Sequence, residues 1–218
     1  MEAQSIMMLI RRVRLAAAAA GFALMLSAAL TGPASGDATV NGDAAAWREV
    51  VAAYGKLNTL SGYRMKTTGP GGGTMVIEVT AGGTAMHAMM QMQDGEVEVV
   101  RVGDQMRVRM DMPGAPAGWR CQGVPPVPRL SDPIGFQGTV DVARGPDVEI
   151  DGRPMHVYVY TLESSAGGAA EAVKTTLYVG VENGLPRRVA LAMPRGDQAM
   201  DYYDYGAPIE IMLPSCGG

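Results

Sequence analysis

Residues that carry out chemistry are scarce in this sequence, which has two His, two Cys and two Trp among 218 residues. A nucleophilic triad needs a Ser or Cys together with a His and an orienting acid. His87 and His156 are the two His, and neither lies near a nucleophile-elbow pattern. Phosphate-binding loops, zinc-ligand spacings and dinucleotide fingerprints are also missing. We therefore expect a protein that is not an enzyme and that uses no cofactor and no metal.

Basic side chains are also fewer than acidic ones. The chain has 18 Lys and Arg against 22 Asp and Glu. Residues 1–36 contain three Arg and one Glu, so the remainder has 15 basic and 21 acidic side chains and a net charge of −6. Binding to nucleic acid depends on clustered Lys and Arg that neutralise phosphates. The composition therefore argues against nucleic acid as a partner.

The longest apolar run is too short to span a membrane. It covers Leu15–Leu30, which is 16 residues, whereas a membrane-spanning helix needs about 20. Three Arg precede this run and small residues follow it up to Gly36, an order typical of a secretory signal peptide. We predict a signal peptide over residues 1–36, cleaved near Ala34-Ser35-Gly36, and one domain over residues 37–218. The alternative is an uncleaved anchor.

Export determines how the two Cys are interpreted. Neither Cys121 nor Cys216 lies near the cleavage site, so the chain has no lipobox and no lipid anchor by that route. The protein would be periplasmic, in the cell envelope or extracellular, where disulfides form and persist. With only two Cys, one pairing exists. We predict a Cys121–Cys216 disulfide.

Four runs of alternating apolar and polar residues occupy residues 73–112. Turn dipeptides separate them: Gly82-Gly83, Asp94-Gly95 and Gly103-Asp104. Gly and Asp tolerate the positive φ that tight hairpin turns require, so the segment predicts a four-stranded antiparallel meander. The expected pairs are Val79 with Met86, Met92 with Val97, Val99 with Val108 and, on the opposite face, Glu98 with Arg109.

This register places twelve apolar residues on one face, because side chains alternate along a strand. Six of the twelve are Met and none is aromatic. We call this set the Met-rich face. Its members are Met75, Ile77, Val79, Met86, Ala88, Met90, Met92, Val97, Val99, Met106, Val108 and Met110.

The composition of the Met-rich face supports two hypotheses. Met is unbranched and polarizable, and it is frequent where a surface accepts varied apolar partners, so the face could line a ligand cavity. It could equally be an ordinary core covered by helices. A copper site, which soft thioethers would suit, is disfavoured because His87 and Met89 point away from Met86 and Met90.

One helix and more strands are predicted around the meander. After a loose lead-in over residues 37–42, Asp43 is expected to cap a helix that ends near Leu60. Ser131 is expected to cap a short helical turn. His156, Tyr158 and Tyr160 are expected on the outward face of their strand. The other predicted strands are Tyr63–Thr67, Thr139–Arg144, Val148–Ile150, 155–163, Lys174–Val181, Arg187–Met193 and a final hairpin of Ala199–Tyr205 with Ile209–Leu213. The fold class is therefore α+β.

Three segments carry a resemblance to a known family. They are Ala45–Lys66, Thr175–Leu191 and Asp201–Cys216. The order of helix, long meander and further meander resembles the LolA/LolB lipoprotein-localisation-factor superfamily and, within it, the LprG/LppX lipid-carrier branch. The resemblance implies a curved antiparallel sheet, an incomplete β-barrel with helices lidding its concave face. It also implies an apolar ligand in that cavity, although this chain lacks the N-terminal Cys that anchors the lipid-carrier branch.

The sequence therefore predicts an exported protein that binds or transports a lipid, a lipoprotein acyl chain or a similar apolar ligand. The ligand-contacting residues would be the members of the Met-rich face other than Ala88. Transient membrane contact and an envelope protein partner fit this function. The alternative is an envelope sensor or protein-binding scaffold of the same fold with a filled core. Cavity volume would separate the two hypotheses.

Overall fold

Nearly every regular element belongs to one large sheet. The structure, a computed structural model, describes residues 38–68, 73–123, 138–164, 173–192 and 196–216. The predicted signal peptide and the helical turn at Ser131 lie outside the described residues.

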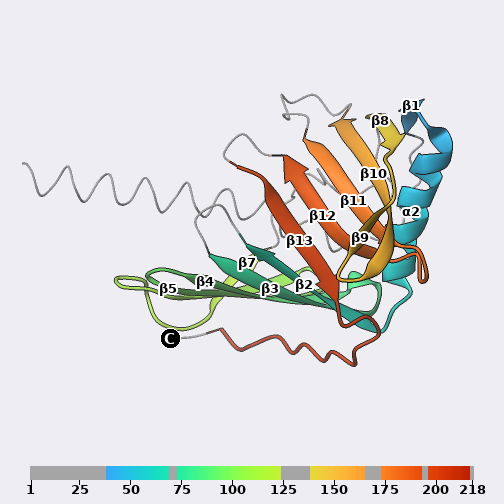
Figure 1. The fold of residues 1–218 in the computed structure, drawn as a ribbon. Helices are drawn as coiled ribbons and strands as arrows, with labels where there is room; N and C mark the ends of the chain where they lie inside the picture. The colour runs from blue at the N-terminus through green and yellow to red at the C-terminus, as the bar shows by residue number, and fades with distance from the viewer. Residues whose placement is uncertain (1–37, 69–72, 124–137, 165–172, 193–195, 217–218) are drawn as a thin grey trace, which may run out of the picture.

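Thirteen strands form the sheet, in the order β1-β8-β10-β11-β12-β13-β2-β3-β4-β5-β6-β7, with β9 paired to β10. Apart from the parallel pair β1 and β8, the strands pair antiparallel. The path does not close, and the sheet is strongly curved (Figure 1). The predicted incomplete barrel is confirmed. The strands are β1 Thr39–Gly42, β2 Gly62–Thr68, β3 Thr74–Thr80, β4 Ala85–Met92, β5 Gly95–Val102, β6 Gln105–Asp111, β7 Arg120–Gly123, β8 Gly138–Arg144, β9 Val148–Ile150, β10 Arg153–Ser164, β11 Lys174–Gly180, β12 Pro186–Ala192 and β13 Gln198–Tyr203.

A single α-helix, α2 (Ala44–Asn58), is present among the described residues, where several lidding helices were expected. As predicted, Asp43 is its N-cap, and its carboxylate accepts hydrogen bonds from the amides of Ala45 and Ala46, which otherwise lack partners in the first turn. Its buried side chains recur at helical spacing and pack on the concave face of the sheet. Figure 1 shows α2 beside β8 and β10.

Aromatic side chains fill the space between α2 and the sheet. Trp47 meets Tyr160 edge-on with ring centroids 5.8 Å apart. Tyr158 and Tyr160 are each 1% exposed, so their predicted outward orientation is wrong. Their rings gain more from burial than their hydroxyls lose, because each hydroxyl finds a partner on α2: Tyr158 donates to Glu49, and the Tyr160 hydroxyl lies 3.5 Å from that of Tyr54.

The meander β3–β6 follows the predicted register at two of its three turns. Val79 pairs with Met86 and Val99 with Val108. Met92 pairs with Gly95 and not with Val97, so the predicted second register is wrong by two residues. A Cβ on Gly95 would collide with the carbonyl oxygen of Asp111. This Gly therefore permits a close approach within β5, and the shift of two residues leaves every side chain on its predicted face.

Both ends of the described part of the chain differ from expectation. Residues 39–42, predicted as a loose lead-in, form β1 beside β8. Residues 209–213, predicted as the last strand, pair with no strand among the described residues. Their alternating Ile209, Ile211 and Leu213 are half-buried. Apolar residues at every second position indicate an extended chain with one packed side, whether or not that chain hydrogen-bonds to a neighbouring strand.

The C-terminal segment, residues 204–216, crosses the outer face of the meander (Figure 1). The amide of Gly206 donates to the carbonyl of Gly62 on β2 at 2.8 Å. At the other end Cys216 forms the predicted disulfide with Cys121 on β7, with Cα atoms 5.7 Å apart. Ile209 of the segment reaches β2, where its Cδ1 atom would lie 3.1 Å from a Cβ added at Gly62.

Candidate ligand-binding face

All twelve residues of the Met-rich face lie on the concave side of β3–β6, in three rows that follow the strand pairing. The pairing links neighbours directly across β3, β4, β5 and β6. One row is Met75, Met90, Val97 and Met110; the next is Ile77, Ala88, Val99 and Val108; the third is Val79, Met86, Arg101 and Met106. The remaining member, Met92, lies beyond the first row on β4. The sequence thus located the face correctly.

Burial divides this face into two parts. Five residues are 0–3% exposed and belong to the core, namely Met75, Ile77, Val79, Met86 and Ala88. The other seven are half-buried, and we call them the open part. The open part comprises Met90, Met92, Val97, Val99, Met106, Val108 and Met110. A ligand on this face would meet the open part, because the buried five have almost no accessible surface.

The position of α2 accounts for this division. The helix makes its main contacts with β8, β12, β1 and the short 3-10 helix η2 (Ala81–Gly83), and β5 and β6 are not among these. The concave face is therefore filled by helix and aromatic rings on one side. On the other side it presents Met and Val. The filled-core hypothesis therefore describes the half of the concave face that α2 covers.

Arg101 interrupts the apolar composition of the concave face, and the sequence analysis missed it. It lies between Met86 and Met106 in the third row. The signal was available, since Arg101 follows Val99 by two residues and so shares its face. Its Nε donates to the carbonyl of Gly103 at 2.9 Å. Burial lowers the pKa of its guanidinium group. Among the described residues it forms no ion pair with a carboxylate.

The outer face of the same strands is polar. His87 lies 3.3 Å from a carboxylate oxygen of Glu78 and 2.8 Å from one of Glu98. Arg64 extends this chain of charges on β2, and Arg109 extends it on β6 with a contact of 2.5 Å to Glu98. The predicted outward pairs, His87 with Glu78 and Glu98 with Arg109, are confirmed. His87 has a structural role in this ladder and does not face the Met-rich side.

The fold is similar to that of the mycobacterial lipoprotein LppX. LppX of Mycobacterium tuberculosis superposes with a TM-score of 0.59 over 78% of this chain and 100% of that chain, at 14% identity. LprF from Mycobacterium bovis gives a TM-score of 0.51 over 80% and 99% of the two chains, also at 14% identity. These likenesses show the fold alone. No family model and no curated protein matches the sequence.

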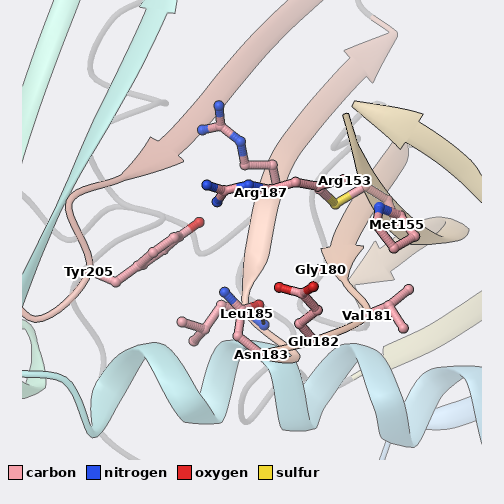
Figure 2. Close-up of a pocket in the computed structure, with 10 residues that line it drawn as sticks. Arg153, Met155, Gly180, Val181, Glu182, Asn183, Leu185, Arg187 and Tyr205 are labelled. Atoms are coloured by element: carbon pink, nitrogen blue, oxygen red, sulfur yellow. Dashed lines mark hydrogen bonds between the residues drawn. The ribbon is translucent and has the colours of Figure 1, made fainter. Parts of the chain in front are cut away.

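A small pocket lies elsewhere, where β10 begins and β11 turns into β12 (Figure 2). Its volume is about 40 Å³, enough for water but not for an acyl chain. Arg187 on its wall donates to Asp151 at 2.8 Å, and burial raises the pKa of the neighbouring Tyr205 to about 12. None of the predicted ligand-contacting residues lines it.

Among the described residues, α2 falls short of the length and apolarity that a membrane-spanning helix requires.

Proposed function

We propose that the protein binds or carries a lipid, a lipoprotein acyl chain or a similar apolar ligand on the open part of the Met-rich face. The observation that carries this proposal is the division of the concave face. Seven contiguous apolar side chains stay half-exposed although the same sheet buries their five neighbours completely. Large apolar patches on a soluble protein commonly mark a site of interaction.

Desolvation would supply the binding energy. Burying hydrocarbon contributes roughly 0.8 kcal/mol per CH₂ group, so eight buried groups would yield about 6 kcal/mol before the entropic costs of association. Four of the seven open residues are Met, namely Met90, Met92, Met106 and Met110. Their flexible side chains can adapt to hydrocarbon chains of different shape. The similarity to LppX and LprF supports a fold suited to such a ligand.

Export is part of this proposal. With residues 1–36 removed as a signal peptide, the remaining domain would act outside the cytoplasm. The intact mass of the protein recovered from a secretion-competent host checks this. A mass corresponding to a chain that begins near Asp37 is expected, and a mass that includes residue 1 would favour the uncleaved anchor.

The decisive experiment compares Met residues on the two faces of β4. Met90→Gln is expected to weaken binding of an environment-sensitive acyl fluorophore about fivefold or more, since it places an amide where a hydrocarbon chain should lie. Met110→Gln on β6 should do the same. Met89→Gln is the matched control, because Met89 is 40% exposed on the outer face. It should leave the fluorophore affinity unchanged.

Thermal unfolding of each variant separates binding from folding. Met90→Gln should unfold cooperatively and within a few degrees of wild type, because its side chain is only half-buried. A wild-type protein that binds no acyl fluorophore would refute the proposal. So would equal weakening by Met89→Gln and Met90→Gln.

A second candidate is an envelope sensor or protein-binding scaffold. The half of the concave face that α2 and the aromatic rings fill supports it, because a filled core needs no ligand. This candidate predicts that organic extracts of the purified protein contain no stoichiometric lipid by mass spectrometry. The carrier proposal predicts the opposite.

A further inference from the structure

Arg101 is the one charged side chain in the three rows of the Met-rich face. Its cross-strand neighbours are Met86 on β4 and Met106 on β6. The next residue on its side of β5 is Val99, which belongs to the open part. A cationic group therefore lies at the end of an apolar strip that continues along β5 through Val99 to Val97.

Two other arginines of the sheet have anionic partners on its outer face. Arg64 bonds to Glu78 at 2.8 Å, and Arg109 bonds to Glu98 at 2.5 Å. Arg107 on β6 bonds to two neutral oxygens, those of Met106 and Gln105, also on the outer side of the sheet. Arg101 donates from its Nε to the carbonyl of Gly103, and among the described residues its side chain makes no bond to an anion. Partial burial lowers the pKa of Arg101 and so penalises its charge, and an anion beside it would relieve this penalty.

We propose that Arg101 binds the anionic head of an amphiphile, a carboxylate or a phosphate, whose hydrocarbon chain lies on the open part of the Met-rich face. A guanidinium group matches both anions through two parallel hydrogen bonds. Arg101 lies four positions after Val97 on β5, a distance of roughly 13 Å at about 3.3 Å per residue. A hydrocarbon chain fixed at Arg101 can therefore cover Val99 and reach Val97. This inference rests on the proposed function and assigns its ligand class.

The test compares amphiphiles with one hydrocarbon chain and different heads. Oleate, oleyl phosphate and oleyl alcohol are each used at pH 8, below their critical micelle concentrations, to displace a neutral acyl fluorophore from the wild-type protein. Both anionic ligands should bind at least about tenfold more tightly than the alcohol, as a charge-assisted hydrogen bond typically provides. Inorganic phosphate should displace nothing, because it has no chain.

Variants of Arg101 then locate the source of the preference. Arg101→Gln should reduce the anion preference to about twofold or less while the affinity for oleyl alcohol stays within about twofold of wild type. Arg101→Lys should retain part of the preference, since it keeps the charge. Arg107→Gln is the matched control, because Arg107 lies between Met106 and Val108 in the chain and so belongs to the outer face, where it pairs with Val100. It should change nothing.

The outcomes distinguish this inference from the proposed function. If wild type binds oleate and oleyl alcohol equally, or if Arg101→Gln keeps the anion preference, the role of Arg101 is refuted and the carrier proposal stands. If wild type binds none of the three ligands, both are refuted. Should Arg101→Gln fail to fold in thermal unfolding, Arg101→Lys decides, because an unchanged preference for the anionic ligands over oleyl alcohol in that variant would contradict bidentate binding by a guanidinium group.

Discussion

Removal of the disulfide should destabilise the protein and release its C-terminal segment. The perturbation is the double substitution of Cys121→Ser and Cys216→Ser, which avoids an unpaired thiol. The bridge spans a sequence separation of 95 residues. For a loop of this size, the chain-entropy relation gives a stabilisation of about 4.6 kcal/mol at 25 °C through the unfolded state.

In the folded protein, the C-terminal segment contributes apolar burial and costs conformational entropy. Half-burial of Ile209, Ile211 and Leu213 contributes roughly 2–4.5 kcal/mol in total, taking about half of the 1.5–3 kcal/mol for each fully buried side chain. The entropy cost of ordering the backbone of this segment opposes that gain. Without the bridge no covalent bond holds residue 216 at β7, so we expect the segment to detach. The net loss of unfolding free energy should then be about 2–4 kcal/mol.

Urea unfolding and limited proteolysis check both parts. With a slope of about 2 kcal/mol per M, the urea midpoint of the double variant should fall by about 1–2 M. Protease should remove residues after about Gly206 from the double variant while the sheet resists digestion. Intact mass after alkylation, with and without reduction, verifies the bridge in wild type. A midpoint within about 0.3 M of wild type, or a protease-resistant segment in the double variant, would refute the reasoning.

Two further predictions concern the helix cap and acid stability. Asp43→Ala should lower the unfolding free energy by about 1 kcal/mol in urea, because the first-turn amides of α2 lose their acceptor, and Asp43→Asn should restore most of it. Partial burial raises the pKa of Glu78, but its hydrogen bonds with Arg64 and His87 lower it more, so that the pKa falls below its ordinary value of 4.5. Glu78 therefore stabilises the fold above its unfolded pKa, and this contribution disappears as the pH falls through the lower folded pKa. Glu78→Gln should make the unfolding free energy less dependent on pH below about 4.5, and an unchanged slope in acid titrations would contradict this.

Local signals in the sequence were sufficient for most of the fold. Asp43 indicated the start of α2 because a capping carboxylate acts on amides only a few residues away. The alternation in residues 73–112 placed the Met-rich face correctly even where a turn was misassigned, because a shift of two residues preserves the parity of a strand. The disulfide followed from the count of Cys. Each of these inferences depends on neighbouring residues or on a unique choice.

The errors arose where distant segments decide the structure. Gly95 resembled a turn residue, but the backbone of β6 requires it. Residues 39–42 contain no strong strand signal and become β1 only because β8 offers them an edge. Tyr158 and Tyr160 were assigned outward because they share a face with His156 and alternate with the apolar Met155, Val157 and Val159. The partners of their hydroxyls lie on α2, more than 100 residues earlier. The division of the Met-rich face likewise depends on where α2 packs, which strand alternation does not encode.

The position of β13 has a consequence for biosynthesis. This last strand joins β12 to β2, so it is the only link between the two arms of the sheet along the hydrogen-bonded path; Thr67 on β2 and Ala199 on β13 are 132 residues apart in the chain. While the chain is being made, β2 has an unpaired edge, and such edges readily pair with strands of other molecules. The two arms can begin to form as local meanders, but they join only after almost the whole chain has emerged. We therefore expect nascent chains that stop before Gln198 to aggregate, and a chaperone that covers the edge of β2 to raise the yield of folded protein.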